Sequence, residues 1–359
     1  MLKKFSVEND ALYKNKITLD FTNVREDIER HPEMVKNGVV EKSLFYDNTV
    51  PLGSIFGQVL FDIVGRLTDD GTSFFCGLQE YDQEDIKLEY LFTFDDVDVE
   101  YKYTRTGFLL TNEILIIDGQ EIVNTEKGGV YNEYLQVPTE ELKKNISWVK
   151  FIGENIDPEL SKINAAYKEF MTFVSRMLYF DNMSLFKYIG MTSGFQDVVG
   201  YFCDETKLDY LVDFFRSIGL DYDLEIREDK GLKILWDKAA GPFAETASSG
   251  TSRLMTLYYW LMFIKDRGGC SFFFINGFDC FLHHSLSSVL YDMLKHMDSQ
   301  VMIHFMTNTS LASYYKSRPD TCFILQKGKM ITLDELTDYK LKTVHNVEKV
   351  FRNKILNIF

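Results

Sequence analysis

One short run of residues constrains the fold of this chain more than any other stretch. Residues 270–275 (CSFFFI) are almost continuously apolar, with Gly268 and Gly269 before them and Asn276 and Gly277 after them. A run of this length without polar alternation is typical of a strand buried on both faces, as at the centre of a parallel sheet. We therefore expect an α/β fold with this strand in the middle of a sheet.

The residues around this strand continue the α/β pattern. A long apolar helix is predicted from about residue 248 to 265, and an amphipathic helix from 285 to 297. Further strands are predicted at 301–305, 321–325 and 330–333. Strands that alternate with helices indicate a parallel sheet with right-handed crossovers.

The N-terminal part contains the context that a phosphate-binding loop requires. Residues 5–8 and 17–21 predict a hairpin. A strand at 43–46, a short loop and a helix at 55–67 follow. Strand, loop and helix in this order are needed for a loop that binds phosphate through its backbone.

The middle of the chain has a different pattern. Residues 87–134 alternate with period two and predict an antiparallel meander, while 158–180 and 205–218 predict amphipathic helices. A hairpin is expected at 223–236 and a C-terminal helix at 347–358. We divide the chain into the N-terminal half of a head (1–86), an antiparallel β insert (87–150), a helical lobe (151–235) and the C-terminal half of the head (236–359).

Composition excludes some classes of function. The formal net charge is −15, which argues against a nucleic-acid binder, because phosphate binding depends on clustered Lys and Arg. A local basic patch, or nucleic acid held by a partner, stays open. The chain has no apolar run long enough to span a bilayer and no signal-peptide core. The five scattered cysteines form no CxxC pair, so we expect a cytoplasmic protein without a metal site.

Several stretches together resemble a known family. They are LKKFSVEN with KNKITLDF near the start, ASSGTSRL at 247–254, FDCFLHH at 278–284 and NTSL with RPD from 308 to 320. The chain resembles, along essentially its whole length, the bacterial ABC-type AAA ATPases related to the OLD and abortive-infection proteins. The resemblance implies an ABC-type P-loop NTPase head: a mixed, largely parallel sheet with an antiparallel β-subdomain and a helical lobe. It also implies dimers with ATP held between two heads.

The phosphate loop of that family is degenerate here. The family has GxxGxGKS, whereas this chain has DNTVPLGS at 47–54. Ser54 matches the hydroxyl position that contacts Mg²⁺, and Gly53 stands in place of the lysine. Asp47 would repel phosphates, and Pro51 has no N–H to donate. The alternative is an ordinary loop between a strand and a helix.

The signature motif of the family is kept. Ser248, Ser249, Gly250 and Thr251 open a helix, and backbone amides with hydroxyls at a helix N-terminus suit an anion. The resemblance implies that this motif meets the γ-phosphate of a nucleotide held by the partner head. A plain serine helix cap would also explain the same residues.

The catalytic positions of the family are replaced. Asn276 and Gly277 stand where the family has Asp and Glu, so the Mg²⁺ carboxylate and the base are missing. Thr307 stands at the position of the histidine that senses the γ-phosphate, and His304, inside the strand, is not expected to substitute. The resemblance assigns Asp279 to a dimer-facing loop. His283 and His284 are adjacent, so we expect them to point apart and to hold no shared metal.

These replacements together indicate a pseudo-ATPase with no catalytic residues and no required cofactor. ATP with Mg²⁺ would bind weakly, through Ser54 and residues 248–251. The resemblance implies a structural or regulatory subunit of an antiphage defence complex, as a homodimer or as a heterodimer with an intact ATPase, a nuclease or another effector. Two alternatives stay open: an atypical ATP-binding ATPase or nucleotide sensor, and a DNA- or RNA-binding scaffold.

Overall fold

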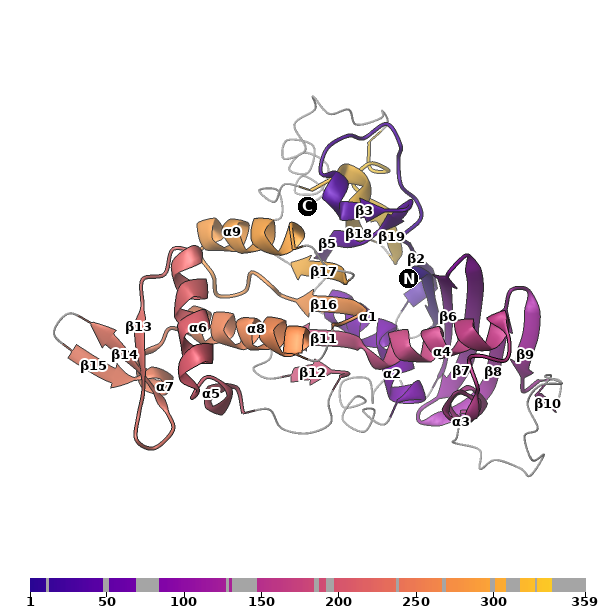
Figure 1. The fold of residues 1–359 in the computed structure, drawn as a ribbon. Helices are drawn as coiled ribbons and strands as arrows, with labels where there is room; N and C mark the ends of the chain where they lie inside the picture. Colours follow the sequence, from indigo (N-terminus) through magenta and orange to yellow (C-terminus); the bar gives the residue numbers. More distant parts are fainter. Residues whose placement is uncertain are drawn as a thin grey trace.

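In the part of the chain that the structure describes, two seven-stranded sheets and the helices around them make up most of the fold (Figure 1). The structure is a computed structural model. The residues that it describes are 1–10, 13–47, 52–68, 84–126, 129–130, 147–183, 187–191, 197–236, 239–266, 269–297, 301–307, 317–326 and 328–337.

The first sheet contains the strand predicted at the centre of the fold. In spatial order its strands are β12 (Lys187–Ile189), β11 (Met177–Asp181), β16 (Phe272–Asn276), β17 (Met302–Thr307), β5 (Lys42–Asp47), β18 (Cys322–Gln326) and β19 (Lys329–Thr332). The strands from β11 to β18 in this order are parallel, and β12 and β19 are antiparallel edge strands. All five residues of β16 are buried. The predicted strand near 43–46 lies in the same sheet as those at 270–275 and 301–305.

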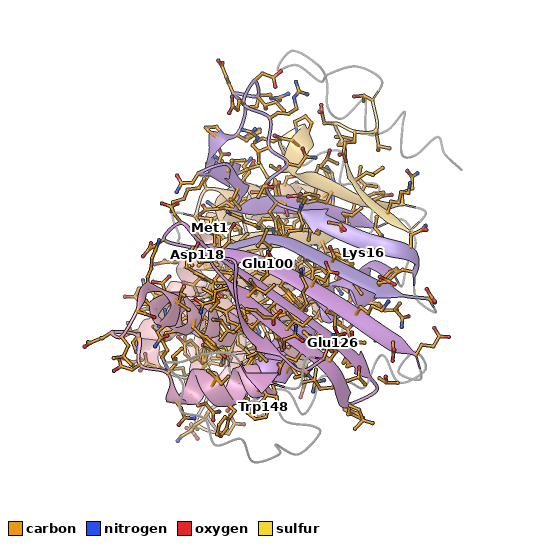
Figure 2. The ribbon with its side chains drawn as sticks, turned by 90° about the vertical axis from the view of Figure 1, so that its right-hand side faces the viewer. Met1, Lys16, Glu100, Asp118, Glu126 and Trp148 are labelled. Atoms are coloured by element: carbon orange, nitrogen blue, oxygen red, sulfur yellow. The ribbon has the colours of Figure 1, made fainter. Side chains whose placement is uncertain are left out.

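The second sheet is antiparallel. Its order is β10 (Gly129–Val130), β9 (Gln120–Asn124), β8 (Leu109–Ile117), β7 (Val97–Thr106), β6 (Asp85–Phe94), β1 (Leu2–Asn9) and β2 (Tyr13–Asp20). Burial alternates strictly along β6 and β7, so one face packs on the core. Figure 2 looks onto the other face, where Lys16 and Glu100 lie. Among the described residues, the predicted meander is confirmed as strands β6 to β10, and the N-terminal hairpin extends the same sheet.

Helices fill the space between the two sheets and cover the outer face of the parallel one. The helices are α1 (Leu52–Leu60), α2 (Asp62–Leu67), α3 (Trp148–Asn155), α4 (Lys162–Ser175), α5 (Val198–Tyr201), α6 (Glu205–Ser217), α7 (Phe243–Thr246), α8 (Ser249–Asp266) and α9 (His284–Lys295). Side chains of α1, α2 and α4 share one hydrophobic core with the inner faces of both sheets. Those of α6, α8 and α9 form a second core with the other face of the parallel sheet.

The remaining elements are short. A three-stranded sheet is formed by β13 (Asp223–Ile226), β14 (Leu232–Trp236) and β15 (Ala239–Pro242), and a two-stranded one by β3 (Val35–Lys36) and β4 (Val39–Val40). Pro32–Met34 and Pro319–Thr321 are 3-10 turns. The predicted hairpin at 223–236 is confirmed and gains the strand β15.

Two helix predictions need correction. The predicted helix at 158–180 ends as α4 at Ser175, and Met177–Asp181 forms strand β11 beside β16. All five residues of β11 are buried, because a short apolar run fits a buried strand as well as it continues a helix. The predicted helix at 55–67 is divided at Phe61 into α1 and α2. The predicted helix at 347–358 lies outside the described residues.

Candidate functional site

The predicted site positions gather at one edge of the parallel sheet. Because β5, β16 and β17 are parallel, their carboxyl ends lie at the same edge, and Asn276 aligns with Met306 while Thr307 aligns with Tyr46. Ligands of α/β sheets bind at this kind of edge. The fold thus brings the ends of the three strands together as the predicted strand and helix order requires.

The phosphate-loop positions are described only in part. Residues 48–51 lie outside the described residues, while Gly53 and Ser54 lie in the first turn of α1. The side chain of Ser54 is not among those described. β5 ends at Asp47 and α1 begins at Leu52, so the two elements occur in the predicted order.

Asn276 is bonded to a carboxylate that sequence reasoning missed. Its Nδ2 atom donates a hydrogen bond of 3.0 Å to Oδ1 of Asp181, which ends the neighbouring strand β11. The backbone N–H of Met183 donates to the same oxygen at 3.0 Å. Asp181 is buried. In the sequence, an acidic residue at the end of the apolar run MLYFD could have indicated this carboxylate. The helix prediction at 158–180 includes that run and so gives no strand end there.

Gly277 is required by the backbone. Its φ of 62° lies in the left-handed region, which glycine adopts readily and other residues rarely. A Cβ atom at this position would lie 2.5 Å from Cγ of Met183 and 2.9 Å from Sγ of Cys280. The position that would carry a general base is therefore both strained and crowded for any side chain.

Thr307 makes a contact within its own chain. Its hydroxyl donates a hydrogen bond of 2.7 Å to Oδ2 of Asp279, and both side chains are buried. The N–H of Phe278 also donates to the carbonyl of Met306 at 3.2 Å. The resemblance assigned Asp279 to a dimer-facing loop, but its side chain ties the segment after β16 to the end of β17.

His304 belongs to the hydrophobic core. It is fully buried, its Nδ1 lies 2.7 Å from Oγ of Ser43, and its ring lies against Phe272 and Phe21. Burial lowers the pKa of His304 to about 3, so the ring is neutral at ordinary pH. This placement agrees with the expectation that it does not substitute for the missing histidine of the switch position.

The signature residues open α8. Oγ of Ser248 accepts a hydrogen bond of 3.1 Å from the backbone N–H of Thr251, which is the contact of a helix cap. Ser248 and Ser249 are exposed, whereas Gly250 and Thr251 are buried. A Cβ atom on Gly250 would lie 2.7 Å from the carbonyl oxygen of Phe281. Close packing of this chain on itself therefore explains the glycine, and the two serines remain open to a partner.

The segment between β16 and α9 lies beside the candidate site and packs against α8. Phe281 is 65% exposed and has a left-handed φ of 65°, and the guanidinium of Arg253 lies 4.2 Å from the centre of its ring. Arg253 also donates to the carbonyl of Met183 at 3.3 Å. The segment is thus held against α8 by a cation–π contact.

The two adjacent histidines begin α9. His283 is its N-cap and accepts from the N–H of Ser285. The rings of His283 and His284 have centroids 4.4 Å apart, so the expectation that they point apart is wrong. Among the described residues, no group of three or more His, Cys, Asp or Glu side chains could hold a metal ion.

Chemically, this edge offers exposed hydroxyls and helix N-termini but lacks the groups of phosphoryl transfer at the predicted positions. Asn276 provides an amide where the family has a carboxylate, and Gly277 provides no base. Asp181 and Asp279 are acidic, but each is buried and bonded to a strand-end side chain.

No family model matches the chain, and no curated protein matches it. Among the described residues, no helix has the length and apolar character that crossing a membrane requires.

Some solved structures are similar to this chain. They include an Smc head bound to the C-winged helix domain of ScpA (11% identity, TM-score 0.45, 93% of this chain and 98% of that chain covered). The SMC head domain from Thermotoga maritima is 9% identical, with a TM-score of 0.45 and coverage of 92% and 98%. An Smc head of Pyrococcus furiosus with an extended coiled coil, bound to the C-terminal domain of ScpA, is 10% identical, with a TM-score of 0.41 and coverage of 93% and 97%.

Proposed function

We propose that this chain is an ABC-type ATPase-like head that does not hydrolyse ATP and serves as a structural or regulatory subunit of a larger complex. The observation that carries the proposal is the state of three positions at the carboxyl ends of β16 and β17. Asn276 is bonded to Asp181, Gly277 has a left-handed φ with Met183 and Cys280 close to it, and Thr307 is bonded to Asp279. Each position is used for the internal structure of the chain and none presents a catalytic group.

The size of the expected loss follows from the chemistry of phosphoryl transfer. Catalysis there depends on positioning and on charge stabilisation by the lysine, the metal and its carboxylates. Removal of one stabilising group costs about 10²–10³ in rate in well-studied cases. Loss of several together leaves no useful turnover.

The biological setting is proposed from the resemblance alone. The stretches shared with the OLD and abortive-infection proteins support a role in a bacterial antiphage defence complex, beside an intact ATPase, a nuclease or another effector. Fold and resemblance do not by themselves define a function, so the enzymatic test comes first.

That test is a turnover assay. We expect purified protein to show no Mg²⁺-dependent ATP hydrolysis above that of the Ser54→Ala variant. A trace of an unrelated ATPase, added to a parallel sample, checks the sensitivity of the assay. Turnover that is clearly above background and is abolished by Ser54→Ala would contradict the proposal.

A second candidate is nucleotide binding without hydrolysis. The exposed residues Ser248 and Ser249 at the start of α8 favour it, because helix N-termini bind anions. A fluorescent ATP analogue, titrated in the same samples with and without Mg²⁺, distinguishes a binding head from an empty one.

A further inference from the structure

A large groove lies at the opposite edge of the parallel sheet from the candidate site. Its volume is about 1070 Å³. The segments that precede β11, β16 and β17 contribute Arg176, Cys270 and Val301 to its walls, so it lies at the amino ends of these strands. Most of the rest comes from α4, α8 and α9, with Phe94 from β6 and Phe214 from α6.

The walls are apolar and come from two different cores. Phe94 and Phe173 belong to the core between the sheets, and their rings are 6.0 Å apart. Phe214 and Tyr258 belong to the other core and stack at 4.3 Å. The groove is therefore a seam between the two cores, which is the kind of place where binding sites occur in proteins.

Methionine side chains line a substantial part of the groove. Met262, Met293 and Met297 are half-buried there. Methionine is flexible and polarisable, and it is common on surfaces that accept partners of varied shape. The groove is thus suited to an apolar partner surface rather than to one rigid small molecule.

Three cations stand at the rim. Lys168, Arg176 and Lys265 are exposed, and within the described residues their side chains have no ion-pair or hydrogen-bond partner. Glu169 is the one acidic residue among the described lining residues. In a chain with a net charge of −15, a rim with a surplus of cations indicates an acidic ligand.

The spacing of the cations favours an extended ligand. Lys168 on α4 and Arg176 at the C-cap of the same helix are eight positions apart, which is about 12 Å at the rise of an α-helix. One carboxylate, as on an acyl chain, can reach only one of them. Acidic side chains spread along a helix can reach both, and also Lys265.

We propose that the groove binds an amphipathic helix of a partner protein, with apolar residues on one face and acidic residues beside them. Apolar anchors at helical spacing would enter between α4 and α8, as in other helix-in-groove complexes. The predicted C-terminal helix of this chain is a poor occupant, because residues 347–358 carry Lys349, Arg352 and Lys354 against Glu348 alone.

The test uses a synthetic probe and the full-length chain. The probe is a fluorescein-labelled helix of about 14 residues, with leucine at the i, i+3, i+4 and i+7 positions and glutamate at most others. We expect saturable binding by fluorescence anisotropy that weakens at higher salt. The Arg176→Gln/Lys265→Gln variant should bind at least fivefold more weakly.

Matched controls distinguish specific binding in this groove from non-specific binding of the peptide. Lys162→Gln removes a cation of the same helix that does not line the groove, and it should leave binding unchanged. The same peptide with lysine in place of glutamate should bind at least tenfold more weakly.

Three outcomes would overturn the proposal: no saturable binding of the acidic peptide, equal binding of the two peptides, or no effect of the double variant. Tight 1:1 binding of dodecanoate with no binding of the acidic peptide would instead assign the groove to an acyl carboxylate.

Discussion

At the scale of single residues, His304 shows how a candidate site residue can be a core residue. It lies on β17, the central strand of the seven-stranded parallel sheet, and packs against Phe21, Phe45 and Phe272. Ser43 on the adjacent strand is its hydrogen-bond partner. Burial in this aromatic cluster disfavours the charged imidazolium.

The first residue-scale prediction concerns acid stability. The folded protein keeps His304 neutral down to about pH 3, whereas the unfolded chain protonates it below about pH 6.5. Between these values the unfolded state binds more protons, so stability falls as the pH falls, by about 1.4 kcal/mol per pH unit from this residue. Urea unfolding from pH 6.5 to 4.5 should show a shallower pH dependence for His304→Gln than for the unchanged protein.

A second variant separates the effect of His304 protonation from the effect of lost contacts around the ring. Ser43→Ala removes the hydrogen-bond partner but keeps the histidine, so it should lower stability by about 1–3 kcal/mol without removing the pH slope. Equal slopes in His304→Gln and the unchanged protein would show that His304 does not govern this pH range.

Gly277 and Gly250 show that the sequence alone does not reveal why a glycine occupies a site position. Gly277 has a left-handed φ, and Gly250 packs on the Phe281 carbonyl. Both features involve the segment between β16 and α9, whose sequence has no periodic pattern from which a structure could be predicted. The replacement of acidic residues could be seen in the sequence, but the physical reason for a glycine could not.

At the scale of elements, one buried ion pair joins α2 to the antiparallel sheet. Nε of Arg105 on β7 donates a 3.0 Å hydrogen bond to Oδ1 of Asp62 on α2, and the Tyr103 hydroxyl donates to Oδ2 at 2.7 Å. Arg105 and Asp62 are 0% and 1% exposed. Both charges are thus removed from water and depend on each other.

Breaking this pair should be costly. Asp62→Ala leaves the Arg105 guanidinium buried without its carboxylate, and we expect a loss of about 3–5 kcal/mol in the free energy of unfolding. The double variant Asp62→Leu/Arg105→Met removes both charges and should lose much less. Denaturant unfolding of the three proteins measures both values. A double variant as unstable as Asp62→Ala would show that packing, rather than charge, holds α2 to β7.

Helices and strands with a clear hydrophobic period could be predicted from the sequence. Which strands pair with one another was harder to predict. The alternation in β6 and β7 and the helical spacing in α9 gave correct elements. Strand β11 was missed because Met177–Asp181 follows α4 after a single residue, and an apolar run does not show whether it is helix or strand. Asp181, and with it the contact to Asn276, was missed for the same reason. The pairing of β1 with β6 joins residues far apart in sequence, and no local pattern reports such pairing.

At the scale of the whole molecule, we propose that the candidate site is one half of a site shared with a partner head. In the ABC-type dimers that the chain resembles, one head provides the phosphate loop and the other the signature motif. This chain has a degenerate phosphate loop and keeps two exposed serines at the start of α8. A homodimer would hold two weak sites, whereas a heterodimer with an intact ATPase would hold one complete site. We expect this second arrangement.

The choice of substitution follows from the structure. Gly250 packs on the segment between β16 and α9 of its own chain, so a side chain there would disturb this head before it reached a partner. Ser249 is exposed in the first turn of α8. A glutamate at a helix N-terminus is tolerated and even stabilising by about 0.3–1 kcal/mol. Ser249→Glu therefore changes the surface charge while keeping the fold.

The last prediction is that Ser249→Glu suppresses ATP turnover by the partner. A carboxylate placed against a γ-phosphate costs several kcal/mol, and each 1.4 kcal/mol lowers the rate about tenfold. The chain is co-expressed with an ATPase from a neighbouring gene, the complex is purified, and its turnover is measured with and without the substitution. Ser175→Glu, at the exposed end of α4 near the other edge of the sheet, is the matched control and should leave turnover unchanged.

Full turnover in the Ser249→Glu complex, or recovery of the chain only as a homodimer or monomer, would rule out a site shared with a partner. In that case Ser248 would be explained as a helix cap alone, because its bond to the Thr251 N–H needs no nucleotide.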